Sequence, residues 1–258
     1  MKALLRRFHK ALFVVVVVGT MCSFRRAEAA DTNAANDLWS FDLHPYLWVA
    51  GIDLETSVPN LPPTNPGVDR FDTRISAGTM VAAQVNRGTV GLFVDFAWLR
   101  LNTEALQPGP AFSAVHLQSD FIHTTAALTY KMPLEGKFQA QILAGARIWY
   151  VANGFTASSG LLPGFDAAKD KTWVDPVIGF DGHYDLSPTW SLLVKGGIGG
   201  FGVSADIAGE AFAGVSYRFT DCCSVTLGYR YLHEEYDRSG FAFNLDTQGF
   251  LLGFDFHF

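Results

Sequence analysis

The C-terminal segment of the chain alternates large apolar residues with small or polar ones, and this pattern constrains the fold more than any other feature. A period of two is the side-chain period of a β-strand, whose successive residues point to opposite faces of a sheet. Segments with this period, each of about ten residues or more, continue back to Leu38. The sequence therefore predicts an all-β chain. In the last segment the residues of one face are Phe250, Leu252, Phe254, Phe256 and Phe258, and those of the other are Gly249, Leu251, Gly253, Asp255 and His257.

The composition predicts a large apolar surface, but the sequence contains no segment for a transmembrane helix after the first 30 residues. Only 17% of the residues are charged, 14% are aromatic, and 22 are phenylalanine. After residue 30, no run approaches the roughly 18 consecutive apolar residues that a transmembrane helix needs. A closed sheet with one face toward lipid and the other toward a packed lumen accounts for both observations. A soluble β-sandwich also alternates, with its apolar face turned inward, and is the alternative fold.

Residues 1–29 have the pattern of a secretory signal peptide that is removed after Sec-type export. Basic residues precede the apolar stretch Ala11–Phe24, and Ala27-Glu28-Ala29 follows as a cleavage site. The 14 residues of that stretch would span about 21 Å of a hydrocarbon core of about 30 Å, which disfavours a short membrane anchor. Cys22 leaves a lipoprotein open, although Gly19-Thr20-Met21 fits a lipobox poorly. The sequence predicts a signal at 1–29 and a barrel at 30–258.

The charge of the processed chain argues against one class of partner. Removal of residues 1–29 takes away six of the 19 Lys and Arg residues and one of the 25 Asp and Glu residues, which leaves a net charge of −11. A nucleic-acid-binding protein needs a basic face. We therefore expect no nucleic-acid partner.

Short and long connections alternate along the chain, as they do in barrels with short periplasmic turns and longer extracellular loops. Four short turns, with both termini on the periplasmic side, give ten antiparallel strands; eight is the alternative count. The short turns are 86–88, 133–136, 187–189 and 220–222; the longer links are 54–70, 102–114, 155–170 and 236–242, with a tight link near 203–206. The expected strands are 39–52, 72–85, 89–101, 115–131, 138–152, 172–185, 190–202, 207–219, 224–235 and 244–258.

Aromatic residues occur near both ends of these expected strands. Transmembrane barrels carry such girdles at the two membrane surfaces. Aromatic residues are also common in strands generally, so the placement supports the barrel without proving it. The residues near short turns are Trp39, Phe138, Trp190, Phe219 and Phe258, and those toward long links are Trp98, Tyr150, Tyr229 and Tyr231.

Three short motifs and the C-terminal residue carry a resemblance to a known family. Segments 41–48 (FDLHPYLW), 171–176 (KTWVDP) and 228–232 (GYRYL) resemble those of a widespread family of mostly uncharacterised outer-membrane β-barrel proteins, often grouped with porin-like and OmpA-type barrels. Phe254, Phe256 and Phe258 resemble the C-terminal signal that the barrel-assembly machinery reads. The resemblance implies an outer-membrane location, with lipid, lipopolysaccharide and that machinery as partners. It brings no assigned activity.

Alternation directs many polar side chains of both charge signs into the lumen. A charge that faces lipid near the midplane costs roughly 2–4 kcal/mol, so the inward direction is favoured. We expect a narrow or plugged lumen with a structural role, or a porin-like pathway for a small solute. The sequence predicts no cofactor and no metal site. The residues expected to form a constriction are Asp95, Arg147, Asp175 and Arg230, and the other lumen candidates are Lys195, Arg218 and Asp255.

Two further classes of function are open. Residues His233–Asp237, near the expected outer rim, could supply a general base to a protease or lipid hydrolase. No G-x-S-x-G motif accompanies them, so we expect no catalytic residues. The link 54–70 contains four prolines, which could stiffen it for binding or adhesion.

Overall fold

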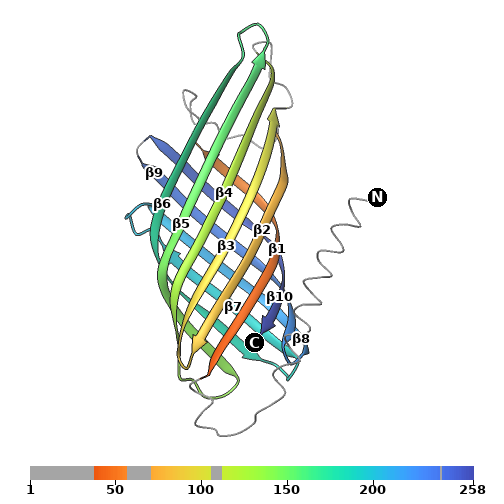
Figure 1. Ribbon diagram of the computed structural model, residues 1–258, viewed down its shortest axis with the longest axis vertical. Coiled ribbons are helices and arrows are strands. Elements are labelled where there is room, and N and C mark those ends of the chain that lie inside the picture. Colours follow the sequence, from red (N-terminus) through yellow and green to blue (C-terminus); the bar gives the residue numbers. More distant parts are fainter. Residues whose placement is uncertain (1–37, 57–70, 106–111, 239) are drawn as a thin grey trace.

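The computed structural model describes residues 38–56, 71–105, 112–238 and 240–258, and shows one closed β-barrel of ten strands (Figure 1). Each strand pairs antiparallel with its neighbours in sequence, and the first strand closes the barrel on the last. The all-β fold and the count of ten are confirmed, and the count of eight is wrong. The strands are β1 Trp39–Thr56, β2 Phe71–Arg87, β3 Val90–Ala105, β4 Phe112–Lys131, β5 Phe138–Ser159, β6 Phe165–Asp185, β7 Trp190–Gly199, β8 Ile207–Thr220, β9 Cys223–Arg238 and β10 Phe241–His257.

Two predicted long links are shorter than expected because strand pairing continues into them. The link 155–170 is mostly strand, since β5 and β6 pair up to Ala157 and Phe165. The link 236–242 is a tight hairpin in which Arg238 pairs with Phe241. The predicted signal peptide at 1–29 and most of the link 54–70 lie outside the described residues. Among the described residues, no helix is long and apolar enough to cross a membrane.

An apolar belt surrounds the outside of the barrel. The side chains of Leu47 and Phe250, for example, are 68% and 65% exposed. On β9 the outward residues are apolar or aromatic up to Tyr231 and then become polar at His233 and Glu235. A closed sheet with an exposed apolar belt is the form in which β-structure crosses a bilayer. The chain therefore has the form of a transmembrane β-barrel, and the alternative of a soluble sandwich is wrong.

The wall is a full barrel at the end with the short turns, which is the periplasmic end in bacterial barrels, and it divides farther up. Pairing of β1 with β2 ends at Pro45 and Val81, and pairing of β6 with β7 ends at Val177 and Gly199. Beyond these points β2–β6 form one leaf, and β9, β10 and β1 form the other, because β7 ends at Gly199 and β8 begins at Ile207. Figure 1 shows the β5–β6 hairpin extending farthest from the end that holds the C-terminus.

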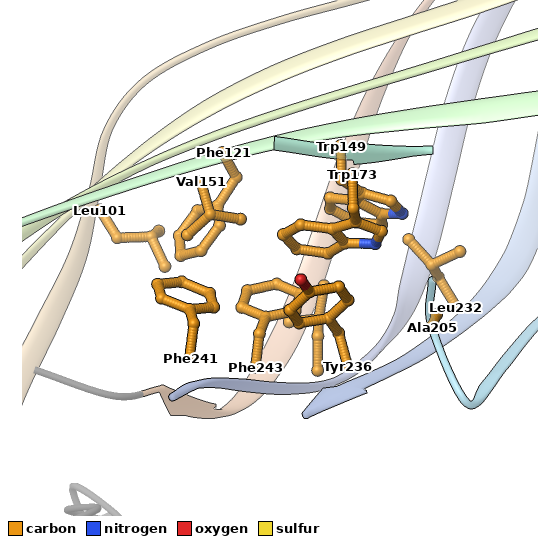
Figure 2. Close-up of a cluster of buried hydrophobic side chains, with 11 residues drawn as sticks. Leu101, Phe121, Trp149, Val151, Trp173, Ala205, Leu232, Tyr236, Phe241 and Phe243 are labelled. Atoms are coloured by element: carbon orange, nitrogen blue, oxygen red, sulfur yellow. The ribbon is translucent and has the colours of Figure 1, made fainter. Parts of the chain in front are cut away.

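An aromatic core fills the space between the two leaves (Figure 2). Trp149 stacks on Trp173 with ring centroids 5.9 Å apart, and Trp173 stacks on Tyr236 at 4.5 Å. Here the outer face of the wall meets water rather than lipid, so the apolar side of each strand turns inward. The sequence did not predict this core. Its buried members are Leu101, Phe121, Trp149, Val151, Trp173, Ala205, Leu232, Tyr236, Phe241, Phe243 and Leu245.

Candidate functional site

Arg230 organises a network of charged side chains inside the barrel. It points inward from β9, and its Nη1 donates to Tyr46 Oη of β1 at 2.9 Å. Its Nη2 donates to Asp95 Oδ2 of β3 and to Glu210 Oε2 of β8, both at 3.1 Å. Tyr46 Oη donates in turn to Asp95 Oδ1 at 2.8 Å. One guanidinium therefore joins strands β1, β3, β8 and β9, which lie on the half of the barrel that runs from β8 through β1 to β3.

A second arginine completes the network. Arg147 Nη2 on β5 lies 2.9 Å from Glu210 Oε2, and its Nε donates to Thr125 Oγ1 at 3.0 Å. We call Tyr46, Asp95, Arg147, Glu210 and Arg230 the lumen cluster. Its two guanidinium and two carboxylate groups balance in formal charge.

Three of the four charged members of the lumen cluster are almost closed to solvent, and the fourth, Glu210, has a side chain that is 25% exposed. Asp95 is 6% exposed, Arg147 3% and Arg230 7%. Taking such ions out of water costs several kcal/mol each, and only partners with good geometry offset that penalty. Each ion here has at least one opposite charge within 3.1 Å. The arrangement therefore forms a polar partition across the lumen.

A cavity of about 590 Å³ lies on the periplasmic side of the lumen cluster. It extends from Tyr46 and Arg230 to Met132 in the turn between β4 and β5. Its wall carries paired charges of both signs: Lys195 Nζ lies 3.0 Å from Asp181 Oδ2. The polar residues that line it include Asp42, His44, Gln84, Gln141, Asp181, His183, Lys195, Arg218, Asp255 and His257.

Six of the seven predicted lumen residues belong to these two features. Asp95, Arg147 and Arg230 meet in the lumen cluster. Lys195, Arg218 and Asp255 line the cavity. Asp255 is held there by several partners: it accepts from Thr226 Oγ1 at 2.6 Å and lies 2.8 Å from His44 Nδ1.

Asp175 was predicted to join the constriction and has a different position. It is fully buried, and its Oδ1 accepts from the backbone amides of Ala205 at 2.7 Å and Ser204 at 3.3 Å. Ser204 Oγ also donates to Val174 O at 2.8 Å. Asp175 therefore fastens the connection between β7 and β8 to the end of the aromatic core.

Tyr46 and Glu210 were not among the predicted constriction residues. Strand parity places both inside the lumen. Asp42 and His44 face inward on β1, so Tyr46 must as well. The pairing of Glu210 with both arginines needs tertiary distances that no local pattern contains.

The predicted assembly signal lies in the wall beside β1. Phe254 is 46% exposed on the outer face. Phe258 and Phe41 exchange two backbone hydrogen bonds, of 2.8 and 3.1 Å. The C-terminal residue thus helps to close the barrel. Recognition of Phe254, Phe256 and Phe258 by assembly machinery stays a prediction.

The predicted rim cluster does not converge on one point. His233, Glu235 and Asp237 face outward, whereas Glu234 and Tyr236 face the aromatic core. His233 Nδ1 lies 3.1 Å from Asp246 Oδ1 on β10. Asp246 Oδ1 also accepts from Tyr231 Oη at 2.6 Å.

Glu234 is a buried acid beyond the membrane-spanning part of β9, which ends at Tyr231. Its side chain is fully buried, and Oε1 accepts from Trp173 Nε1 at 3.0 Å. Oε2 has no hydrogen-bond partner among the described residues. Burial away from water raises the pKa of Glu234 to about 8, so the carboxyl is protonated at neutral pH.

Comparisons with known proteins support the fold but assign no function. No protein-family model matches the chain, and no curated protein matches it. The structure is similar to outer membrane protease OmpT from Escherichia coli, with a TM-score of 0.52 and 9% identity over 87% of this chain and 98% of that one. Similarity also extends to the translocator domain of autotransporter NalP from Neisseria meningitidis (TM-score 0.42, 9% identity, 95% and 98% covered). The attachment invasion locus protein Ail of Yersinia pestis gives a TM-score of 0.39 and 11% identity, with 85% and 98% covered. The predicted likeness to outer-membrane β-barrel proteins is thus confirmed at the level of fold.

Proposed function

We propose that this outer-membrane barrel is closed to diffusion and that its lumen serves as a binding cavity for a small polar solute on the periplasmic side. The observation that carries the proposal is the bridging of Tyr46, Asp95 and Glu210 by Arg230. These contacts join opposite walls, so no water-filled path passes between them without breaking a buried ion pair. The porin-like pathway is the weaker of the two predicted roles.

The aromatic core supports closure as well. It lies between the lumen cluster and the extracellular end, with Trp149, Trp173 and Phe243 each at most 4% exposed. A solute that entered from outside would have to separate stacked rings before it reached the charged groups.

The cavity suits a solute that carries both charge signs. Lys195 and Arg218 provide cationic groups, and Asp181 and Asp255 provide carboxylates, on the same wall. A volume of about 590 Å³ is within the range of small-molecule sites, which is roughly 300–1,000 Å³.

Planar-bilayer recording of the processed protein tests closure. We expect no unit conductance above leak at any salt concentration. Stepwise conductance of the wild-type protein would reject the proposal.

Cysteine labelling tests the side of access. In a background with Cys222→Ser and Cys223→Ser, a Ser216→Cys variant places a thiol on the cavity wall. A small charged thiol reagent should label it from the periplasmic side and not from intact cells. Equal labelling from outside would contradict a periplasm-facing cavity.

We also propose that the polar rim at His233 is a solvated edge rather than an active site. Its five residues divide between two faces of β9, so they do not act on one substrate. Cleavage of lipopolysaccharide or peptide that is lost in His233→Ala and retained in His116→Ala would overturn this. Adhesion through residues 54–70 is a separate possibility, which deletion of 56–68 with an intact barrel would test.

A further inference from the structure

The barrel wall has a seam between β1 and β2 at the height of the outer leaflet. Within the described strands, β1 and β2 pair only over Trp39–Pro45 and Val81–Arg87. Farther up, β1 pairs with β10 alone and β2 with β3 alone. Pro45 has no backbone N–H, which favours the end of pairing at this residue. Outward residues of β1 just above it, Leu47 and Val49, are 68% and 75% exposed, so the lower part of the seam faces lipid.

A small cavity lies inside the wall at the seam. Its volume is about 50 Å³, and its lining includes Trp48 and Ile52 on one edge of the seam and Met80 on the other. Leu99 and Phe121 form part of its apolar far wall. The cavity is separate from the polar cavity at the periplasmic end.

Three nitrogen atoms on the side chains that line this cavity lack hydrogen-bond partners within the described part of the chain. Trp48 Nε1, His123 Nε2 and Trp149 Nε1 are buried and have no hydrogen-bond partner among the described residues. His123 is 5% exposed and Trp149 1%. His123 Nε2 lies 3.8 Å from Asp95 Oδ2, which is too long for a hydrogen bond. An unsatisfied buried polar group costs free energy, and three on one apolar cavity point to a bound group that carries an acceptor.

The charges nearby decide what kind of acceptor fits. Arg230 lies over the Trp48 ring, 5.1 Å from its centroid, but already contacts Asp95 and Glu210. The lumen cluster is balanced in formal charge, so a further carboxylate beside Asp95 would find no unpaired cation in the cluster. An uncharged hydroxyl or carbonyl avoids this repulsion and still accepts from an indole N–H.

We propose that this cavity binds a small apolar molecule with one uncharged hydroxyl or carbonyl group, which reaches it from the outer leaflet through the β1–β2 seam. The polar end lies against Trp48 and His123, and the apolar part lies along the seam. The site is independent of the solute cavity proposed above.

NMR of the processed protein in lipid nanodiscs, labelled with ¹⁵N-tryptophan, tests binding directly. The probes are 1-octanol and n-octane, which differ by one hydroxyl. We expect 1-octanol to shift the indole N–H signals of Trp48 and Trp149 saturably, with an affinity about tenfold or more above that of octane. The outer-surface residues Trp39 and Trp190 serve as internal controls and should show no saturable shift. Octane shifts equal to those of octanol, or no saturable shift at Trp48 and Trp149, would overturn the proposal.

Two variants locate the site and its access route. Ala97→Leu fills the cavity from β3 and should abolish the saturable shift, whereas Ala127→Leu, also buried but outside the cavity lining, should not. Heat-modifiable gel mobility confirms that each variant is a folded barrel. A retained shift in folded Ala97→Leu would reject this cavity.

Cross-linking across the seam tests the route. A Leu47→Cys/Thr79→Cys pair, two positions beyond Pro45 and Val81, would be joined by a short bifunctional thiol reagent in the background with Cys222→Ser and Cys223→Ser. We expect the joined protein to lose the octanol shift and the unjoined variant to keep it. The matched control joins Leu43→Cys to Ala83→Cys, a pair already in register, and should keep the shift. Unchanged binding after the seam is joined would refute access through it.

Discussion

Arg230 shows at the scale of one residue how a charge can be stable inside a membrane barrel. Its guanidinium has acceptors on three other strands, and each acceptor has a further partner: Tyr46 donates to Asp95, and Glu210 also pairs with Arg147. Because the members of the network are paired with one another, removal of one charged member leaves the charge of its partner without that counter-ion.

Replacement of Arg230 by methionine should therefore be strongly destabilising. Arg230→Met leaves Asp95 without its nearest cation, and loss of one partner from a buried pair costs roughly 3–5 kcal/mol. Urea unfolding of the protein in liposomes measures this loss. The matched control is Lys195→Met, which breaks a pair in which the Lys195 side chain is 41% exposed and should cost at most about 1 kcal/mol. Equal effects of the two substitutions would contradict the buried network.

Glu234 predicts a dependence of stability on pH. Its pKa is raised from an ordinary 4.5 to about 8 in the folded protein, so the folded state holds the proton more tightly than the unfolded state. This contribution is fully present below about pH 4.5 and is lost as the pH rises through about 8, a loss of about 5 kcal/mol.

Glu234→Gln should remove that part of the pH dependence and leave the variant more stable than the wild type at pH 9. Unfolding midpoints at pH 5, 7 and 9 measure the effect. The outward-facing neighbour gives the control, since Glu235→Gln should retain the wild-type slope. An unchanged slope in Glu234→Gln would assign the pH dependence to other groups.

Strand β10 shows what a sequence pattern can and cannot give at the scale of an element. From Gly249 to Phe258 the predicted faces are correct, with Phe250 and Phe254 outside and Asp255 inside. From Phe241 to Leu245 the same parity places apolar residues inside. Alternation fixes which residues share a face, but only the position of the membrane boundary decides which face is apolar.

The same boundary explains the missed strand ends. The link 236–242 was expected to be a loop, whereas it continues the pairing of β9 with β10 and turns Tyr236 and Phe241 inward. Charges in the lumen could be predicted because lipid excludes them from the other face. Their grouping could not, since Asp95, Arg147 and Arg230 come from strands that are distant in sequence.

Substitutions on the two halves of β10 should differ accordingly. Phe243 is fully buried, and its ring lies 5.7 Å from that of Trp149 and 5.4 Å from that of Trp173. Phe243→Leu should cost about 2 kcal/mol through lost ring contacts and an unfilled volume. Phe250→Leu replaces a side chain that faces fluid lipid and should cost less than about 0.5 kcal/mol. Unfolding in liposomes compares the two, and equal costs would show that the upper strand is not packed inward.

At the scale of the whole molecule, the lumen cluster and the aromatic core lie one behind the other along the barrel axis. We propose that the lumen cluster closes the membrane-embedded part by ion pairing, and that the aromatic core closes the part beyond the membrane by apolar packing. If both are complete, opening either one alone leaves the barrel closed. Side chains can form such layers across a barrel of ten strands, because the interior of this barrel is only slightly wider than side chains can fill.

Conductance of three variants tests this arrangement in series. Asp95→Ala/Arg230→Ala opens the lumen cluster while keeping the charge balanced, since the Arg147–Glu210 pair stays. Trp149→Ala/Phe243→Ala opens the aromatic core. We expect neither pair alone to give unit conductance in planar bilayers, and the combination of all four substitutions to give it. Heat-modifiable gel mobility establishes that each variant is folded before recording. Conductance from either pair alone would mean that the other layer is not a barrier, and closure would then depend on one layer only.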